Sequence, residues 1–386
     1  MLGTTRGFLL LLCGAVTIAA PLAPLACGSP DARSGFDPAD DSAPAPPSEG
    51  GGPGFGDGGL GACQPDPDAF DIPGNGCDDD GDGAIDNVRT CDEGLGVFGD
   101  AAAFARAIGL CQGVVSATFT RGHASVEPPA DGQHGVLPAF GKVIRAREGA
   151  NLGVLSTGWA RAYDDLSATS CDPATLTHCF KQGVQMQGGV PTLGAAPPGF
   201  PKSVAGCSVS DQLFDAISLK VDVRVPKNVQ GFSLDFDFFS GEWPDYVCTK
   251  YNDGFVLLVD GQNVAYDAQG NPLSVNNAFF DRCTVGTQTG CRGEPPIFGV
   301  SSCGGDLSEL EETGFHVPGL YCNAQLSAGG GATGWLTTQS PASPGGTLHL
   351  ELVIWDSGDS KFDSTVLVDH FQWVPIVSAP STSRLR

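Results

Sequence analysis

Apolar residues recur at every second position in several segments of the second half of the chain. This period of two is clear over residues 219–225, 233–238 and 348–354, and it begins again at 366–368. Residues 255–259 are instead continuously apolar. Alternation places one face of a strand in a core and the other in water, and a continuous run is consistent with a more buried strand. These segments are therefore predicted to be β-strands.

The fold predicted from these strands is mainly β. The strands are far apart in sequence and must meet to close one core, which favours an antiparallel β-sandwich of jelly-roll or lectin-like type. One short N-terminal helix is predicted over residues 98–110, with Asp100 near its start. Long loops that contain Gly, Pro and Cys separate the strands.

The N-terminus predicts export. Arg6 precedes an apolar run over residues 8–20, as in a secretory signal peptide covering residues 1–26. The sequence Leu-Ala-Pro-Leu-Ala-Cys that ends at Cys27 resembles a bacterial lipobox, which makes Cys27 a lipid anchor and places the protein in the cell envelope, at the outer membrane or cell surface. The alternative is cleavage by signal peptidase I, a secreted chain and a Cys27 that pairs elsewhere.

Composition divides the remainder of the chain. Residues 27–62 are rich in Gly, Pro and Asp and have too few apolar residues to offset the entropy of folding, so they are expected to be a disordered tether. Residues 63–91 form a Cys-bounded acidic unit, residues 92–376 the β domain and residues 377–386 a tail.

The charge balance limits the partners. The 386 residues contain 44 Asp and Glu against 20 Lys and Arg, a net charge of −24. Nucleic acid is not expected as a partner, because phosphate contacts need clusters of Lys and Arg. Clustered carboxylates would suit calcium.

The cysteines indicate disulfides. Of 14 cysteines, 12 remain once Cys13 in the signal and Cys27 are set aside, and an even number in an exported chain favours bridges. Short spacings suggest three pairs, although sequence alone does not fix connectivity: Cys171 with Cys179, Cys283 with Cys291, and Cys303 with Cys322.

An acidic loop carries the sharpest local motif. Asp78, Asp80 and Asp82 stand at positions 1, 3 and 5 of an EF-hand-like pattern, with Asp86 at position 9. Arg89 stands at position 12, where an EF-hand has a bidentate Glu, so calcium binding is expected to be weak or completed by another ligand. The alternative is a solvated acidic turn held by disulfides. The stretch also resembles the MopE-like metal-binding motif of bacterial surface proteins.

Five further motifs follow in order over residues 153–158, 240–247, 251–255, 271–277 and 355–364. Together they resemble the choice-of-anchor L domain of bacterial surface proteins, over roughly residues 92–376. The resemblance implies a β-rich extracellular domain that is shared among proteins with different surface anchors. A lipid on Cys27 would be the attachment here.

Oxygen-bearing residues lie beside the predicted strands within these motifs. Ligands from two loops at one edge of a sandwich would suit calcium, whereas the alternative is that these residues cap turns and accept backbone hydrogen bonds. The candidates are Glu242, Asp245, Asn252, Asp253, Asp356, Asp359 and Asp363.

The function predicted from these features is non-catalytic: binding, adhesion or surface structure. Trp243 and Trp335 lie in loop-like contexts and are candidates for stacking on a surface glycan or a protein ligand. The alternative is a secreted carbohydrate-active hydrolase that uses two loop carboxylates such as Glu242 and Asp359. A deep cleft with two facing acids and no third oxygen ligand would favour the hydrolase.

Overall fold

The computed structural model of the protein describes residues 63–162, 195–276, 279–293, 296, 299–300, 303–318 and 328–385. The predicted signal peptide, Cys27, the tether and the Cys171–Cys179 pair lie outside these residues. Within them the chain folds mainly into antiparallel β-sheets, as the alternation predicted.

The first main sheet has six strands. Its order is β1-β6-β17-β8-β10, and β9 also pairs with β8, at Leu258 and Val259. The strands are β1 (Val114–Thr120), β6 (Leu213–Arg224), β8 (Gly254–Val259), β9 (Gln262–Asn263), β10 (Leu273–Ser274) and β17 (Thr347–Ser357).

The second main sheet has seven strands. Its order is β19-β16-β7-β18-β5-β2, and β15 also pairs with β7. The strands are β2 (His134–Leu137), β5 (Leu152–Ser156), β7 (Gly231–Ser240), β15 (Gly331–Ala332), β16 (Leu336–Pro341), β18 (Ser364–Val374) and β19 (Ser381–Arg384).

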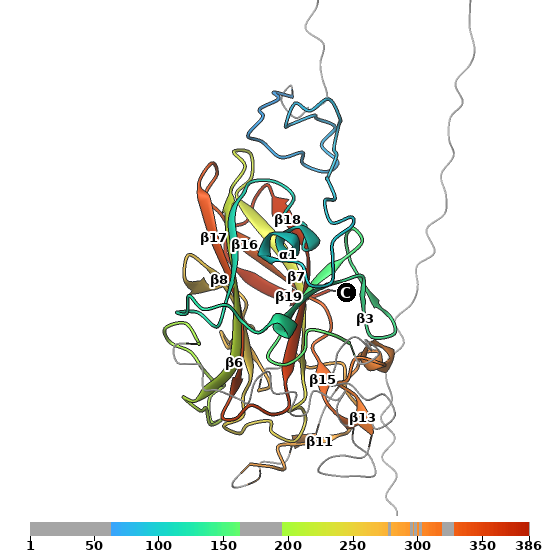
Figure 1. Cartoon of the computed structure of the whole chain (residues 1–386), viewed down its shortest axis with the longest axis vertical. Coiled ribbons are helices and arrows are strands. Elements are labelled where there is room, and N and C mark those ends of the chain that lie inside the picture. Colours follow the sequence, from blue (N-terminus) through green and yellow to red (C-terminus); the bar gives the residue numbers. More distant parts are fainter. Residues whose placement is uncertain are drawn as a thin grey trace, which may run out of the picture. The chain divides into compact units, whose positions relative to one another are not determined.

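The two main sheets lie against each other (Figure 1). Side chains from both sheets form one hydrophobic core. Leu219, Leu257 and Leu352 from the six-stranded sheet belong to the same buried cluster as residues of the seven-stranded sheet. The rings of Phe236 and Phe255, one from each sheet, lie 5.3 Å apart. This shared core supports the sandwich prediction.

The predicted strands correspond to β6, β7, β8, β17 and β18, but the exposure expected for β7 was wrong. All ten residues of β7 are buried, including Asp235 and Asp237 on the face that was expected in water. The reason is that this outer face packs against a second hydrophobic cluster, in which Phe239 of β7 contacts Phe140 and Phe315.

The predicted helix is present but shorter. It is α1 (Ala101–Ala107), and the side chain of Asp100 caps it by accepting a hydrogen bond from the amide of Ala103. Phe104 and Ile108 bury its apolar side in the shared core. No helix in the described part of the chain has the length and apolar character needed to cross a membrane.

Short elements complete the fold. The segment expected to be a tail contributes β19, which pairs with β16 at the edge of the seven-stranded sheet. The others are β3 (Ala139–Phe140), β4 (Ile144–Arg145), β11 (Gln288–Thr289), β12 (Gly299–Val300), β13 (Val317–Pro318) and β14 (Ala328–Gly329), with 3-10 turns at η1 (Asp131–Gln133) and η2 (Leu307–Leu310).

Disulfides join several loops, but two predicted pairings were wrong. Cys283 bonds to Cys303. Cys283 is therefore not paired with Cys291, and Cys303 is not paired with Cys322. Sequence spacing favoured the nearer cysteine, whereas the fold brings the Cα atoms of Cys283 and Cys303 to 5.5 Å. The other described bridges are Cys63–Cys77, Cys91–Cys111 and Cys207–Cys248.

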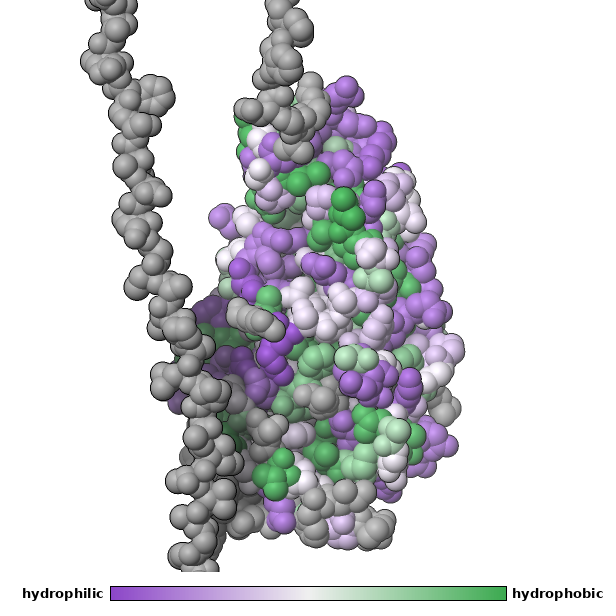
Figure 2. Space-filling model, turned by 180° about the vertical axis from the view of Figure 1, so that it is seen from behind, coloured by the Kyte–Doolittle hydropathy of each residue, from purple (hydrophilic) through white to green (hydrophobic). Residues whose placement is uncertain are grey.

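The surface has mixed polarity. In the face shown in Figure 2, hydrophobic residues are interspersed among hydrophilic ones. Such a mixture is usual for a folded domain exposed to water.

Candidate metal sites

Four carboxylates converge in the acidic loop. Asp71, Asp78, Asp80 and Asp82 each place an oxygen within 4.8 Å of the others. Three of them are the ligands predicted from the EF-hand-like spacing. The fourth, Asp71, was missed because it lies seven residues before the motif, where no spacing rule points to it.

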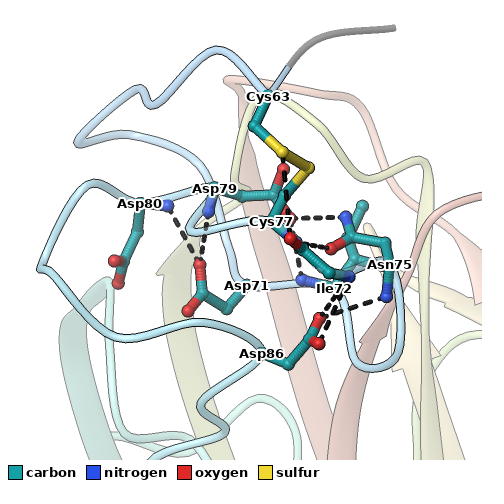
Figure 3. The surroundings of a disulfide bond; sticks show 9 residues. Cys63, Asp71, Ile72, Asn75, Cys77, Asp79, Asp80 and Asp86 are labelled. Carbon is teal, nitrogen blue, oxygen red and sulfur yellow. Dashed lines mark hydrogen bonds between the residues drawn. A yellow bond between two sulfur atoms is a disulfide. The ribbon is translucent and has the colours of Figure 1, made fainter. Parts of the chain in front are cut away.

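Backbone hydrogen bonds fold the loop around these carboxylates. The amide of Asp82 donates to both Asp78 and Asp80, each at 3.0 Å, and the amide of Gly83 donates to Asp78 at 3.0 Å. Gly83 has a φ of 96°, a conformation that side chains disfavour. The Cys63–Cys77 disulfide fixes the residue before Asp78 (Figure 3).

Asp71 forms the buried floor of the loop. Its side chain is 1% exposed and accepts hydrogen bonds from the amides of Asp79 and Asp80 at 2.7 and 3.0 Å (Figure 3). Burial raises the pKa of Asp80, and the negative charge of Asp71 raises it further. A cation among these carboxylates would remove their mutual repulsion.

Two residues of the motif have other partners. Asp86 points to the preceding turn and accepts hydrogen bonds from the amides of Asn75 and Gly76, both at 3.1 Å (Figure 3). Asp86 was predicted to be the ligand at position 9 of a calcium loop, but it does not lie among the four converging carboxylates. The guanidinium of Arg89 pairs with Asp82 and lies 3.7 Å from Asp80.

The acidic loop is attached to the β domain. Phe70 exchanges two hydrogen bonds with the side chain of Asn228, at 2.9 and 2.7 Å. Lys227 forms ion pairs with Asp66 and Asp68. The pocket that contains Asp71 and Asp80 is also lined by Trp373 of β18. A change in the loop can therefore affect the stability of the domain.

A second set of acids lies where strands of both main sheets end. Glu242 follows β7, Asp253 directly precedes β8, Asp356 lies near the end of β17 and Asp363 directly precedes β18. These four side chains are at most 2% exposed. Asp215 of β6, a residue that the sequence did not single out, adds its negative charge near Asp356.

Hydrogen bonding in this second set is incomplete. Asp253 accepts from the amide of Ser357 at 2.9 Å and from the hydroxyl of Ser364 at 2.7 Å. By contrast, Oε2 of Glu242 and both carboxyl oxygens of Asp356 are buried and accept no hydrogen bond from a described residue. Neither Glu242, Asp253 nor Asp356 forms an ion pair within the described part of the chain.

Burial dominates the electrostatics of these groups. It raises the pKa values of Glu242 and Asp356 well above the usual range, and the charge of Asp253 raises both further. Burial also raises the pKa of Asp253 and of Asp215 to about 7. In each case the dominant effect is negative charge held out of water.

The remaining predicted ligands have other contacts. Asp245 lies 3.4 Å from the guanidinium of Arg292, and Asn252 accepts a hydrogen bond from the amide of Asn276 at 3.0 Å. Asp359 accepts from the amide of Lys361 at 2.9 Å, and its charge also raises the pKa of Glu242. These contacts match the turn-capping alternative more closely than a ligand role.

The two tryptophan candidates differ in exposure. Trp243 is 8% exposed and stacks on Phe280 with ring centroids 4.6 Å apart, so core packing covers its ring. Trp335 is partly buried, and the guanidinium of Arg147 lies 5.4 Å from its ring centroid. Of the two, Trp335 is the one that keeps exposed ring surface.

The comparisons with known proteins identify a domain. Residues 202–371 match the family model of the choice-of-anchor L domain. No curated protein and no solved structure matches the chain. The match begins ahead of β6 and ends in β18, so it contains all five acids of the second set. It points to a role at the bacterial surface without catalysis, and residues 202–371 of this chain are similar to the choice-of-anchor L domain.

Proposed function

We propose that the protein is an exported, lipid-anchored surface protein whose choice-of-anchor L domain has a non-catalytic role in binding, adhesion or surface structure. The domain match carries this proposal. The signal-like N-terminus, the lipobox-like sequence at Cys27 and the disulfides agree with it. The membrane would be reached through the lipid, and the ligand would be a surface glycan or another protein.

Replacement of the anchor cysteine tests the location. The variant Cys27→Ala should move the protein from the membrane fraction to the soluble exported fraction, because the lipid would be lost while the signal remains. The wild type should incorporate a labelled fatty acid and the variant should not. Equal membrane retention of both proteins would contradict the lipid anchor.

Calcium is the second part of the proposal, and the convergence of Asp71, Asp78, Asp80 and Asp82 supports it. Oxygen ligands from carboxylates are what calcium prefers, and weak sites are common in extracellular modules. Because Asp71 lies on the side of the loop that faces β18, calcium there would stabilise the attachment of the loop to the domain.

The variant Asp80→Asn tests the loop. Calcium at about 1 mM should stabilise the wild type against heat, and Asp80→Asn should reduce this gain because one ligand charge is lost. Glu93→Gln is the matched control, since Glu93 is an exposed carboxylate outside the cluster. An equal calcium gain in all three proteins would contradict the loop site.

The hydrolase alternative is less well supported. Glu242 is 2% exposed, which leaves little access for a sugar, and Asp253 lies beside it as a further carboxylate. A glycosidase needs a pair of acids open to the substrate. The burial of Glu242 therefore argues against its use as one of a catalytic pair.

A further inference from the structure

The turn ahead of the acidic loop contains Asn75 followed by Gly76, and no other asparagine of the 386-residue chain precedes a glycine. An asparagine side chain can react with the amide nitrogen of the next residue to form a cyclic succinimide. A glycine in that next position favours the reaction, because it has no Cβ to crowd the ring. Gly76 is exposed, and a Cβ built on it would meet nothing within 4 Å, so the surroundings leave room for ring closure.

The side chain of Asn75 is folded back over this peptide (Figure 3). Its Oδ1 accepts a hydrogen bond from the amide of Cys77 at 2.7 Å, which closes an Asx turn. Its Nδ2 donates to Asp79 at 2.7 Å. In an Asx turn the side chain curls back over the intervening peptide, and here that peptide carries the nitrogen of Gly76. The turn therefore holds the side-chain carbonyl on the side of the nitrogen that would attack it.

Two hydrogen bonds of the turn suit the chemistry of ring closure. The amide of Gly76 donates to both carboxyl oxygens of Asp86, at 3.1 and 3.2 Å. The attacking nitrogen has to lose this proton, and a positioned carboxylate that receives it acts as a general base. The amide of Cys77 already donates to Oδ1 of Asn75, the oxygen on which negative charge develops, so it can stabilise that charge.

We propose that Asn75 is a site of spontaneous deamidation in the folded protein, with Asp86 as the base and the amide of Cys77 as the oxyanion donor. The nitrogen of Gly76 forms a bond to Cγ of Asn75 while its proton passes to Asp86. The proton then returns through water to Nδ2 as the bond between Cγ and Nδ2 breaks, and ammonia leaves. Water opens the ring at either carbonyl, which leaves aspartate or isoaspartate at position 75.

The modification would loosen the start of the acidic loop. Nδ2 of Asn75 lies 2.7 Å from a carboxyl oxygen of Asp79, so a carboxylate in its place turns a hydrogen bond into a repulsion between two negative charges. Isoaspartate would also lengthen the backbone by one methylene ahead of Cys77, the residue that precedes Asp78. The inference concerns covalent chemistry of the turn and does not require calcium.

Peptide mapping by mass spectrometry tests the inference on the oxidised full chain, incubated at neutral pH. The peptide that contains Asn75 should gain the mass difference between an amide and an acid, and a protein isoaspartate methyltransferase should label the product. The variant Asp86→Asn should react about tenfold or more slowly, because its amide can accept a hydrogen bond but cannot take the proton. Asparagine also tolerates the φ of 54° at this position. Glu93→Gln, an exposed position outside the turn, is the matched control and should react like the wild type.

A purely structural role of Asp86 would give the opposite result, because a looser turn reaches ring-closing geometries more often and deamidates faster. An equal or faster rate in Asp86→Asn therefore overturns the proposal. If Asp86→Asn does not fold, the wild type is compared with itself in urea, with its disulfides intact. The folded chain should react faster than the unfolded chain, since the base and the oxyanion donor are in place only in the fold. Equal or slower reaction of Asn75 in the folded chain overturns the proposal.

Discussion

Arg89 stands at the loop position where an EF-hand has a bidentate glutamate. Its guanidinium pairs with Asp82 and approaches Asp80, so it occupies the side of the loop where that glutamate would bind. The arginine therefore competes with a cation for the same carboxylates. This explains physically why the loop should bind calcium weakly.

Replacing Arg89 should strengthen calcium binding by the loop. Arg89→Glu removes the competing positive charge and adds the missing carboxylate, so calcium affinity of the loop should rise about tenfold or more, which is about 1.4 kcal/mol. Arg89→Gln should give a smaller rise, since it removes only the charge. Isothermal titration with calcium measures both. Unchanged affinity in Arg89→Glu would mean that the loop is not a calcium site.

Asp237 should make stability depend on pH. Burial raises its pKa to about 7 in the folded protein, from 3.8. Between these values the unfolded state has released the proton and the folded state has not, so the free energy of unfolding should fall as pH rises from about 4 to 7. The full effect would be about 4 kcal/mol.

The variant Asp237→Asn should make this decline shallower without removing it, because the amide cannot ionise and its oxygen can still accept from Thr333, whereas Asp215 and Asp253 still titrate near 7. Urea unfolding at several pH values between 4 and 8 measures the slope. Glu93→Gln, at an exposed position, should leave the wild-type slope unchanged. If Asp237→Asn and the wild type have the same pH dependence of the free energy of unfolding, Asp237 does not contribute to that dependence.

The sequence predicted part of each candidate site. Alternate spacing identified Asp78, Asp80 and Asp82, because ligands of one loop are close in sequence. It did not identify Asp71 or Asp215, which the fold brings near from other segments. It also could not separate Asp356 from Asp245 and Asn252, because burial and hydrogen-bond partners, not residue type, distinguish them.

At the scale of elements, the helix and the seven-stranded sheet meet at a glycine. A Cβ on Gly153 of β5 would lie 2.3 Å from Cζ of Phe104 in α1. This close approach is possible only without a side chain, and the surrounding core residues leave Phe104 little room to move.

The variant Gly153→Ala should therefore destabilise the protein by about 1–3 kcal/mol through overpacking. The control is Gly96→Ala, because a Cβ there would meet nothing within 4 Å. Chemical denaturation of both variants measures the difference. Equal stabilities would mean that α1 does not pack on β5 in this way.

Elements were easier to predict than their surroundings. Strands β6, β8, β17 and β18 follow from the period of two or from a continuous apolar run. The same period predicted a solvent-exposed face for β7, which is wrong because β3, which contains Phe140, and the segment around Phe315 cover that face. Alternation predicts which residues share a face of a strand, but it does not predict which other segments of the fold cover that face.

In the whole molecule, a domain similar to a bacterial surface domain follows a loop whose carboxylates could bind calcium. The residues that match the choice-of-anchor L domain model include the buried acids, and the segment ahead of the match contains the acidic loop. Both hold more negative charge than their neighbours compensate. Calcium is abundant outside cells, so an exported chain can depend on the ion for its folded state.

The most direct measurement is the thermal unfolding of the oxidised full chain in about 1 mM calcium and in excess chelator. We predict a midpoint higher by about 1–5 °C in calcium, since an ion that binds only the folded state stabilises it and a weak site is partly filled at this concentration. Magnesium at the same concentration should give a smaller rise, because it demands a more regular shell and keeps its water. The same midpoint in calcium and in chelator would contradict the account.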